Sequence, residues 1–591
     1  MKSERPELKL LLAAGILLLA VGIRFWALGE MPLAKAEAEL ALEAFQAARQ
    51  QEPAASPQPL YGMLTAAAFF LLGDSNFTAR FIPALLGSLV VLLPLLLWRK
   101  IGWKVALLLA AGFAIDPVFS AFSRQASAAM LGLFFLSGAA AAWSSKRAFL
   151  TGFLVSAGLL CGAPAWSGLL GLSLALLLGR LIPAIGLDSI SSLLGRSNEG
   201  TQPFDWRQAG LGAGAALALF GSWLLLTPGT LSAVVGSIPA YLSGFLQPSG
   251  VPALRLVLAA VLLQPLPVIF GLLGAVRGWR ERDSLSRWLS TWVTAALLVV
   301  VLYPGRQAYD LLWVTLPLWL LAARELEKQL FDGEETLTVG WLHAGLVFLL
   351  LAITWLNLAA IDPRVLDQSM LLRWVLVVGV LSIGVVASVF IGLGWSWRTA
   401  RVGVVLGVSC ALALALFGNS LGAVVEQENR ANEILYPVPS AGELELLTAS
   451  LEDLAEWRTG RKDSLDAAVV VDAAELRWAL RNMPNVYFAP SLKANELPSV
   501  ILSSAAAPEP SLAIAYRGQD FSLRVSPDWS GALPGNWTEW LLYRTGEVMK
   551  ESIILWVRSD VLPGGETIFT NPGASDFQAP VNPLDIDPAA P

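Results

Sequence analysis

Residues 10–28 read LLLAAGILLLAVGIRFWAL, an apolar run that a single charged residue, Arg24, interrupts near its end. A helix crosses the hydrocarbon core of a bilayer with about 20 predominantly apolar residues, so this run is long enough to span a membrane. It could pass for a signal peptide, but no small-residue cleavage site follows it. We therefore interpret the run as a retained first membrane span.

The rest of the 591-residue chain repeats this pattern. Hydrophobic residues make up 55% of the sequence and charged residues 15%, and the mean hydropathy is +0.61. A soluble protein carries about 25% charged residues, so a single soluble domain is excluded. The sequence predicts a polytopic α-helical membrane protein with about thirteen spans, near residues 10–28, 80–98, 104–122, 126–144, 148–164, 167–184, 209–227, 252–275, 287–304, 309–324, 339–360, 371–394 and 402–419.

Basic residues alternate between the connections of these spans. Richer connections contain pairs such as Lys146 and Arg147, whereas the intervening ones contain mostly single arginines. The positive-inside rule then places the N-terminus in the cytoplasm. An odd number of spans places the C-terminal region outside, in an integral protein of the inner or plasma membrane.

Two outside segments are too long to be simple turns. Residues 29–79 contain a predicted helix over 34–50, a proline-broken linker, and an apolar run over 60–72 that is short for a span. Residues 228–251 carry no charge. We expect helices of both segments to lie at the membrane interface.

The C-terminal region has a different composition and periodicity. From residue 420 onward there are 12 basic against 24 acidic residues. Helical patterns over 444–457 and 474–481 alternate with strand patterns over 467–472, 485–488, 499–503, 511–516, 520–525 and 552–558, which indicates a small α/β domain. We therefore expect a transmembrane domain over 1–425, an extracytoplasmic domain over 426–570 and a proline-rich, disordered tail over 571–591.

Several kinds of site are disfavoured by the residue inventory. Both cysteines, Cys161 and Cys410, fall in apolar segments, so no disulfide framework is expected. The single histidine, His343, also lies on an apolar span, which argues against a histidine-based dyad or a zinc site. We expect no metal, no cofactor and no nucleic-acid partner.

Charged side chains near the outer ends of the spans are the candidates for chemistry, because charge at a membrane is costly. Glu37 and Glu39 lie on the predicted loop helix, where one carboxylate can act as a general base toward an acceptor hydroxyl. Spacing alone favours a solvated helix face for them. Arg80, Arg124 and Arg306 lie at outer span ends, where each either binds a lipid phosphate or snorkels to the interface.

The order of several short motifs resembles GT-C class membrane glycosyltransferases, in particular the protein O-mannosyltransferase and aminoarabinose-transferase-like family (glycosyltransferase family 39-like). The resemblance covers most of residues 10–325. Its motifs are Met31-Pro32, Ala36-Glu37-Ala38, Pro59-Leu60-Tyr61, Leu72-Gly73, the run from Arg80 to Gly87, Asp116-Pro117, Ser123-Arg124, and Gly305-Arg306 with Tyr309 and Pro317.

The resemblance implies inverting transfer of one sugar from a polyprenyl-phosphate donor to a protein, lipid or glycan acceptor at the outer membrane face. It implies Glu37 or Glu39 as the catalytic base, and Arg80, Arg124, Arg306 and Tyr309 at the donor phosphate. The family carries an Asp-Glu pair in the first loop, and Ala36 occupies the Asp position here.

Two other readings remain open. The first is a catalytically impaired GT-C-like protein that binds glycolipid or scaffolds envelope assembly, which the missing Asp favours. The second is a transporter, which the lack of an inverted repeat and of paired broken helices disfavours.

Overall fold

The computed structural model describes residues 6–49, 56–185, 204–222, 230–331, 337–361, 368–425, 432–435, 440–492, 496–507, 514–529, 533–535 and 537–562. The chain forms two compact units, residues 1–441 with 525–549, and residues 442–524 with 550–591. The chain thus enters the second unit, returns to the first for residues 525–549, and re-enters the second. The expected tail over 571–591 lies outside the described residues.

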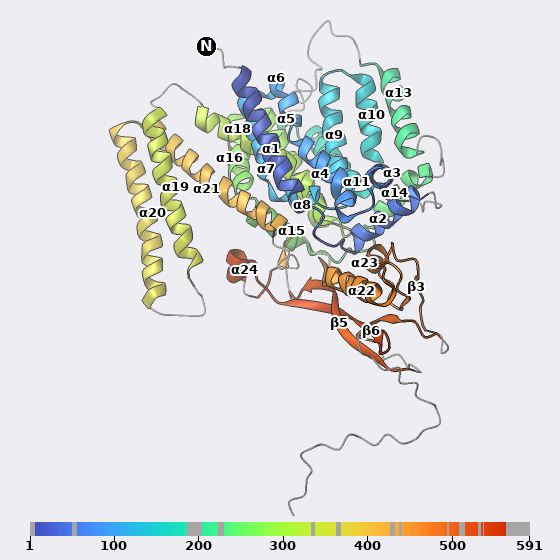
Figure 1. The fold of residues 1–591 in the computed structure, drawn as a ribbon. Coiled ribbons are helices and arrows are strands. Elements are labelled where there is room, and N and C mark those ends of the chain that lie inside the picture. The colour runs from blue at the N-terminus through green and yellow to red at the C-terminus, as the bar shows by residue number, and fades with distance from the viewer. Residues whose placement is uncertain are drawn as a thin grey trace, which may run out of the picture. The chain divides into compact units, whose positions relative to one another are not determined.

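The first unit is built almost entirely of helices (Figure 1). In chain order they are α1 (Pro6–Phe25), α2 (Lys35–Ala48), α3 (Pro59–Leu72), α4 (Asn76–Val90), α5 (Leu93–Leu96), α6 (Trp98–Ile101), α7 (Trp103–Ile115), α8 (Pro117–Ser123), α9 (Ala129–Ser144), α10 (Ala148–Leu159), α11 (Ala163–Leu181), η1 (Pro183–Ile185), α13 (Trp206–Ala216), the π-helical turn η2 (Leu217–Gly221), α14 (Thr230–Ser243), α15 (Ala253–Leu263), α16 (Pro265–Glu281), α17 (Ser284–Leu302), η3 (Ala308–Asp310), α18 (Leu311–Phe331), α19 (Leu337–Ala359), α20 (Gln368–Gly394), α21 (Trp397–Val425) and α24 (Trp537–Tyr543).

The prediction of a polytopic helical membrane protein is confirmed. Within the described residues, seven helices are long and apolar enough to cross a bilayer, or up to nine if each of two bent pairs counts as one span. Three further apolar helices, α3, α9 and α10, are shorter than a full span. The expected number of thirteen spans is not confirmed.

Two of the predicted spans are broken, although the sequence analysis found no paired broken helices. The span expected over 104–122 consists of α7 and α8, which meet at Asp116-Pro117 with a bend of 57°. The span expected over 252–275 consists of α15 and α16, which meet at Gln264-Pro265 with a bend of 93°. At each break a proline is the first residue of the second helix, where its missing backbone N–H is not needed, and it disfavours helical conformation for the residue before it.

Small residues allow close contact between helices. A Cβ atom added to Gly152 of α10 would lie 1.8 Å from the carbonyl oxygen of Ala209 in α13, and one added to Gly212 would lie 2.0 Å from the carbonyl oxygen of Phe149. Glycine and alanine let helix backbones approach in this way, which replaces the hydrophobic driving force that is absent inside a bilayer.

The second unit contains a mixed sheet and two helices, α22 (Leu444–Thr459) and α23 (Ala474–Ala479). Strands β5 (Tyr516–Pro527), β6 (Val548–Arg558), β4 (Val500–Ser504), β2 (Ala467–Val469) and β3 (Val486–Phe488) lie in that order. The two-residue strand β1 (Ser440–Ala441) precedes them in the chain. Strand β2 is parallel to β3 and β4, whereas β4 is antiparallel to β6. The predicted α/β arrangement is therefore present.

Candidate functional site

The first loop contains a helix, α2, whose first turn is held by Glu37. This side chain is only 6% exposed. Its Oε2 accepts a hydrogen bond from the N–H of Ala34 (3.1 Å), so Glu37 caps its own helix, and its Oε1 accepts one from the N–H of Ala126 (2.9 Å). A carboxylate in the first turn also complements the positive end of the helix dipole.

Arg80 of α4 forms a two-pronged ion pair with Glu37. Its Nε and Nη2 lie 3.0 and 2.8 Å from the two carboxylate oxygens. Its remaining N–H groups donate to the carbonyls of Leu28 (3.3 Å), Met31 (2.7 Å) and Pro32 (3.0 Å). The predicted donor-phosphate residue Arg80 and the predicted base Glu37 thus lie together and fix the first loop against α4.

Arg124 lies just after α8 and contacts the end of α1. Its Nη1 donates to the carbonyls of Arg24 (3.0 Å) and Trp26 (2.5 Å). Arg24 is fully buried and donates in turn to the carbonyl of Phe113 (2.8 Å) and to the Ser123 hydroxyl (3.1 Å). The two arginines therefore join the first span to α7 and α8.

Arg306 and Tyr309, the other two predicted phosphate residues, belong to the connection between α17 and α18. The guanidinium of Arg306 donates to the carbonyls of Val251, Val300 and Val301 at 3.0 to 3.1 Å. Tyr309 is half-buried, and burial together with the charge of Asp310 raises the pKa of its hydroxyl. To contact a phosphate, Arg306 would have to break at least one of these hydrogen bonds to a backbone carbonyl.

Asp310, which the sequence analysis did not single out, is the buried acid of this second cluster. It is 2% exposed, and its Oδ2 accepts a hydrogen bond from the N–H of Gln307 (2.8 Å). Burial raises the pKa of its carboxyl to about 6, although hydrogen bonds from Gln307 and Ser167 and the charge of Arg306 oppose the shift. An acid next to Tyr309 in an outer connection was the only sequence signal for it.

Two more carboxylates lie on α2. Glu39 is exposed. Glu43 is half-buried, and one of its carboxylate oxygens has no hydrogen-bond partner among the described residues. Burial raises the pKa of Glu43, with the charge of Glu39 acting in the same direction and a hydrogen bond from Ser56 opposing it. A raised pKa makes a carboxylate a stronger base near neutral pH.

Asp116 lies at the break between α7 and α8 and is completely buried. Its Oδ1 accepts hydrogen bonds from the N–H groups of Val118 (2.9 Å) and Phe119 (3.1 Å), which caps α8. Gln264, at the other helix break, and Trp319 donate to it at 2.9 and 2.8 Å. This set of contacts identifies Asp116 as a structural residue that links the two broken spans.

No group of three or more histidine, cysteine, aspartate or glutamate side chains that could hold a metal ion occurs in the described ranges. At the first loop the structure brings together the carboxylate of Glu37 and the guanidinium of Arg80. Carboxylates can transfer protons and guanidinium groups can bind anions.

No protein-family model matches the chain, and no curated protein matches it. Among solved structures, ArnT from Cupriavidus metallidurans bound to undecaprenyl phosphate is similar, with 12% identity and a TM-score of 0.53 over 95% of this chain and 100% of that one. The same enzyme in the apo state has 12% identity and a TM-score of 0.48 over 93% and 98%.

An oligosaccharyltransferase from Archaeoglobus fulgidus has 15% identity and a TM-score of 0.29 over 60% of this chain and 56% of that one. At 12% identity, the similarity to ArnT bound to undecaprenyl phosphate concerns the fold. The chain therefore has the fold of ArnT, a GT-C glycosyltransferase, and is an integral membrane protein.

Proposed function

We propose that the chain is a membrane glycosyltransferase that moves one sugar from a polyprenyl-phosphate donor to an acceptor at the outer membrane face. The observation that carries the proposal is the ArnT-like fold over nearly the whole chain, and the solved ArnT structure contains undecaprenyl phosphate. The buried Glu37–Arg80 pair supports it, because it holds a first-loop helix in one position beside the spans.

The proposed orientation follows from the positive-inside rule. The N-terminus lies in the cytoplasm, and the second unit lies on the outer side. The first loop, with α2 and α3, then lies on the outer face as well.

In the proposed reaction, an acceptor hydroxyl oxygen attacks the anomeric carbon of the donor sugar. The bond from that carbon to the phosphate oxygen breaks, polyprenyl phosphate leaves, and the hydroxyl proton passes to a carboxylate. We assign the proton acceptor to α2. Glu37 already accepts four hydrogen bonds, so we propose that it positions the loop and that Glu39 or Glu43 accepts the proton.

One observation favours the second candidate, a non-catalytic glycolipid-binding protein. Position 36, where the resemblance calls for an aspartate, is alanine. Of the acids that follow it on α2, Glu37 pairs with Arg80, and Glu39 and Glu43 lie three and seven positions after Ala36. A site without a well-placed base would retain the donor and fail to transfer its sugar.

The test uses the purified, detergent-solubilised full chain with a panel of radiolabelled polyprenyl-phosphate sugars. Transfer or release with any donor would support the enzyme. Glu39→Gln and Glu43→Gln should then separate the two bases, since one of them should lower turnover by about a hundredfold or more. Glu327→Gln, on α18, is the matched control and should retain the wild-type rate.

Donor binding without turnover would instead favour the glycolipid-binding protein. If the chain turns over and both α2 variants retain the wild-type rate, the base does not lie at Glu39 or Glu43. If no donor binds and none turns over, the proposed function is wrong.

A further inference from the structure

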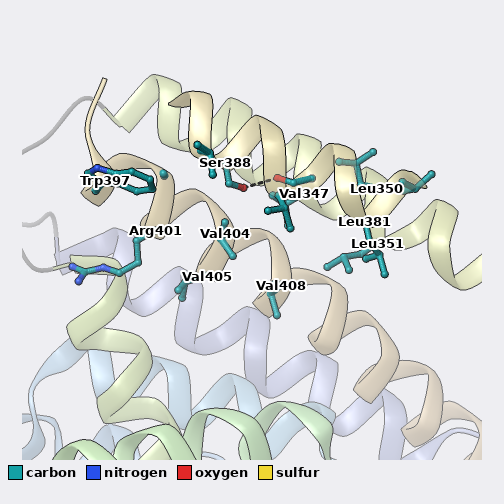
Figure 2. A pocket seen from close by; sticks show the side chains of 15 residues that line it. Val347, Leu350, Leu351, Leu381, Ser388, Trp397, Arg401, Val404, Val405 and Val408 are labelled. Atoms are coloured by element: carbon teal, nitrogen blue, oxygen red, sulfur yellow. Dashed lines mark hydrogen bonds between the residues drawn. The ribbon is translucent and has the colours of Figure 1, made fainter. Parts of the chain in front are cut away.

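A groove of about 490 Å³ lies among α19, α20 and α21, far in sequence from the first loop. Figure 2 shows its shape: Trp397 and Arg401 lie at one end, and Leu350, Leu351 and Leu381 lie at the other. Apart from Ser388 and the groups at the Trp397 end, the lining consists of valine, leucine, glycine and alanine. The volume falls in the range of about 300–1,000 Å³ that is typical of ligand sites.

The end with Trp397 faces the membrane side on which the chain begins. Lys9, in α1, lies 5.3 Å from the ring of Trp103 at the start of α7, and Lys104 lies 4.4 Å from the ring of Phe331 at the end of α18. The chain then continues into α19. A Cβ atom at Gly403 of α21 would lie 2.4 Å from the ring of His343 near the start of α19, so these two helix starts lie together.

Along α21, the length of the groove is close to the thickness of the hydrocarbon region of one leaflet. On α21 its lining runs from Trp397 to Val408, which corresponds to about 16 Å at 1.5 Å per residue. Half of a hydrocarbon core about 30 Å thick is about 15 Å. A transmembrane helix of a partner would need a groove of twice this length, whereas an acyl chain of one leaflet matches it.

Arg401 is the charged side chain among the residues that line the groove. Within their described bounds, α19, α20 and α21 contain no acidic residue, and their only arginines are Arg373, Arg398 and Arg401. Arg398 and Arg401 lie at the Trp397 end, and Arg401 has no hydrogen-bond or ion-pair partner among the residues that the structure describes. Tryptophan is typical of the headgroup level, and basic pockets between membrane helices bind anionic headgroups.

We propose that this groove is a binding site for an anionic glycerophospholipid of the leaflet on the N-terminal side. One acyl chain lies along the valine and leucine lining, and the phosphate lies at Arg401 with Arg398 beside it. Trp397 marks the level of the headgroup. The site is separate from the proposed transfer reaction and does not depend on it.

The test is native mass spectrometry of the delipidated full chain with phosphatidylglycerol or phosphatidylcholine of identical acyl chains. One arginine near a membrane surface favours an anionic lipid about fivefold. The wild type should therefore retain at least about five times as much phosphatidylglycerol as phosphatidylcholine. Arg401→Gln should bring the ratio close to one. Arg373 lies near the start of α20 and does not line the groove. Arg373→Gln should therefore leave the ratio of the two bound lipids unchanged.

A second variant tests the apolar lining. Val404→Trp fills the groove and should lower retention of both lipids, with an unchanged elution volume showing that the protein is folded. Equal retention of the two lipids by the wild type, or equal losses in Arg401→Gln and Arg373→Gln, would overturn the proposal. Two other results would also overturn the proposal. One is a dimer of the wild type that Val404→Trp abolishes. The other is a preference for polyprenyl phosphate over phosphatidylglycerol that Arg401→Gln removes.

Discussion

Glu37 and Arg80, 43 positions apart in the sequence, share two hydrogen-bonded contacts of 3.0 and 2.8 Å in a site from which water is almost excluded. The pair joins a loop helix to a membrane span. Arg80 also donates hydrogen bonds to three backbone carbonyls of the segment between α1 and α2.

Glu37→Gln should destabilise the protein by about 3–5 kcal/mol, because it leaves the buried guanidinium of Arg80 without its counter-charge. Thermal unfolding of the detergent-solubilised protein measures the effect. Glu39→Gln, on the exposed face of the same helix, is the control and should change stability by less than about 0.5 kcal/mol. Equal melting temperatures for Glu37→Gln and the wild type would show that the pair does not hold the loop.

Asp310 should make the stability of the protein depend on pH. Its pKa is about 6 in the folded state, against an ordinary value of 3.8, so the folded state binds the proton more tightly than the unfolded state. The contribution of Asp310 to the free energy of unfolding should therefore fall as pH rises from about 4 to 6, by at most about 3 kcal/mol. Above about pH 6 this contribution should stay constant.

Asp310→Asn removes this penalty, so its advantage in melting temperature over the wild type should grow from pH 4 to pH 6. Asp283→Asn is a control of opposite sign. Burial of Asp283 is outweighed by hydrogen bonds from Ser286 and by the charge of Arg324, which lower its pKa. That variant should be less stable than the wild type near neutral pH, and the difference should shrink in acid.

Gly152→Ala should destabilise the contact between α10 and α13. The new methyl group would lie 1.8 Å from the carbonyl oxygen of Ala209, and overpacking of this kind costs about 1–3 kcal/mol. Gly210→Ala is the matched control, because a Cβ atom there meets nothing within 4 Å. A lower melting temperature is expected for the first variant alone, and an equal effect of both would contradict the close helix contact.

The proposed orientation is tested by cysteine labelling. In a background in which Cys161 and Cys410 are replaced by alanine, a cysteine at exposed Ala449 in the second unit should react with a membrane-impermeant maleimide in intact cells. A cysteine at exposed Ser145, between α9 and α10, should react only after permeabilisation. Labelling of Ser145→Cys in intact cells, with Ala449→Cys reacting only after permeabilisation, would show that the orientation is the opposite of the one proposed.

Apolar patterns predicted most of the secondary structure, because a helix in lipid or a strand in a sheet needs apolar residues at regular positions in its own sequence. The loop helix expected over 34–50 is α2, and the strands expected over 485–488 and 499–503 are β3 and β4. The bends at Asp116-Pro117 and Gln264-Pro265 were missed. Hydropathy averages over about 19 residues and does not detect a change of helix direction within an apolar run.

The candidate site was less predictable, because its contacts join distant segments. The resemblance identified Glu37 and Arg80, but only the folded structure shows that they bind each other. Asp116 was noticed as part of a motif, yet its partner Trp319 lies 203 positions away. Asp310 was overlooked, since burial, which raises its pKa, is not visible in the sequence around it.

The return of residues 525–549 to the first unit limits how the protein can be divided for study. Trp540, in this returning segment, is fully buried in the helical core and donates its indole N–H to the carbonyl of Asn432 at 2.7 Å. A truncation at residue 441 would remove this tryptophan and leave a cavity in the core of the first unit. A shortened protein that lacks only the sheet should instead retain residues 525–549, joined through a flexible linker.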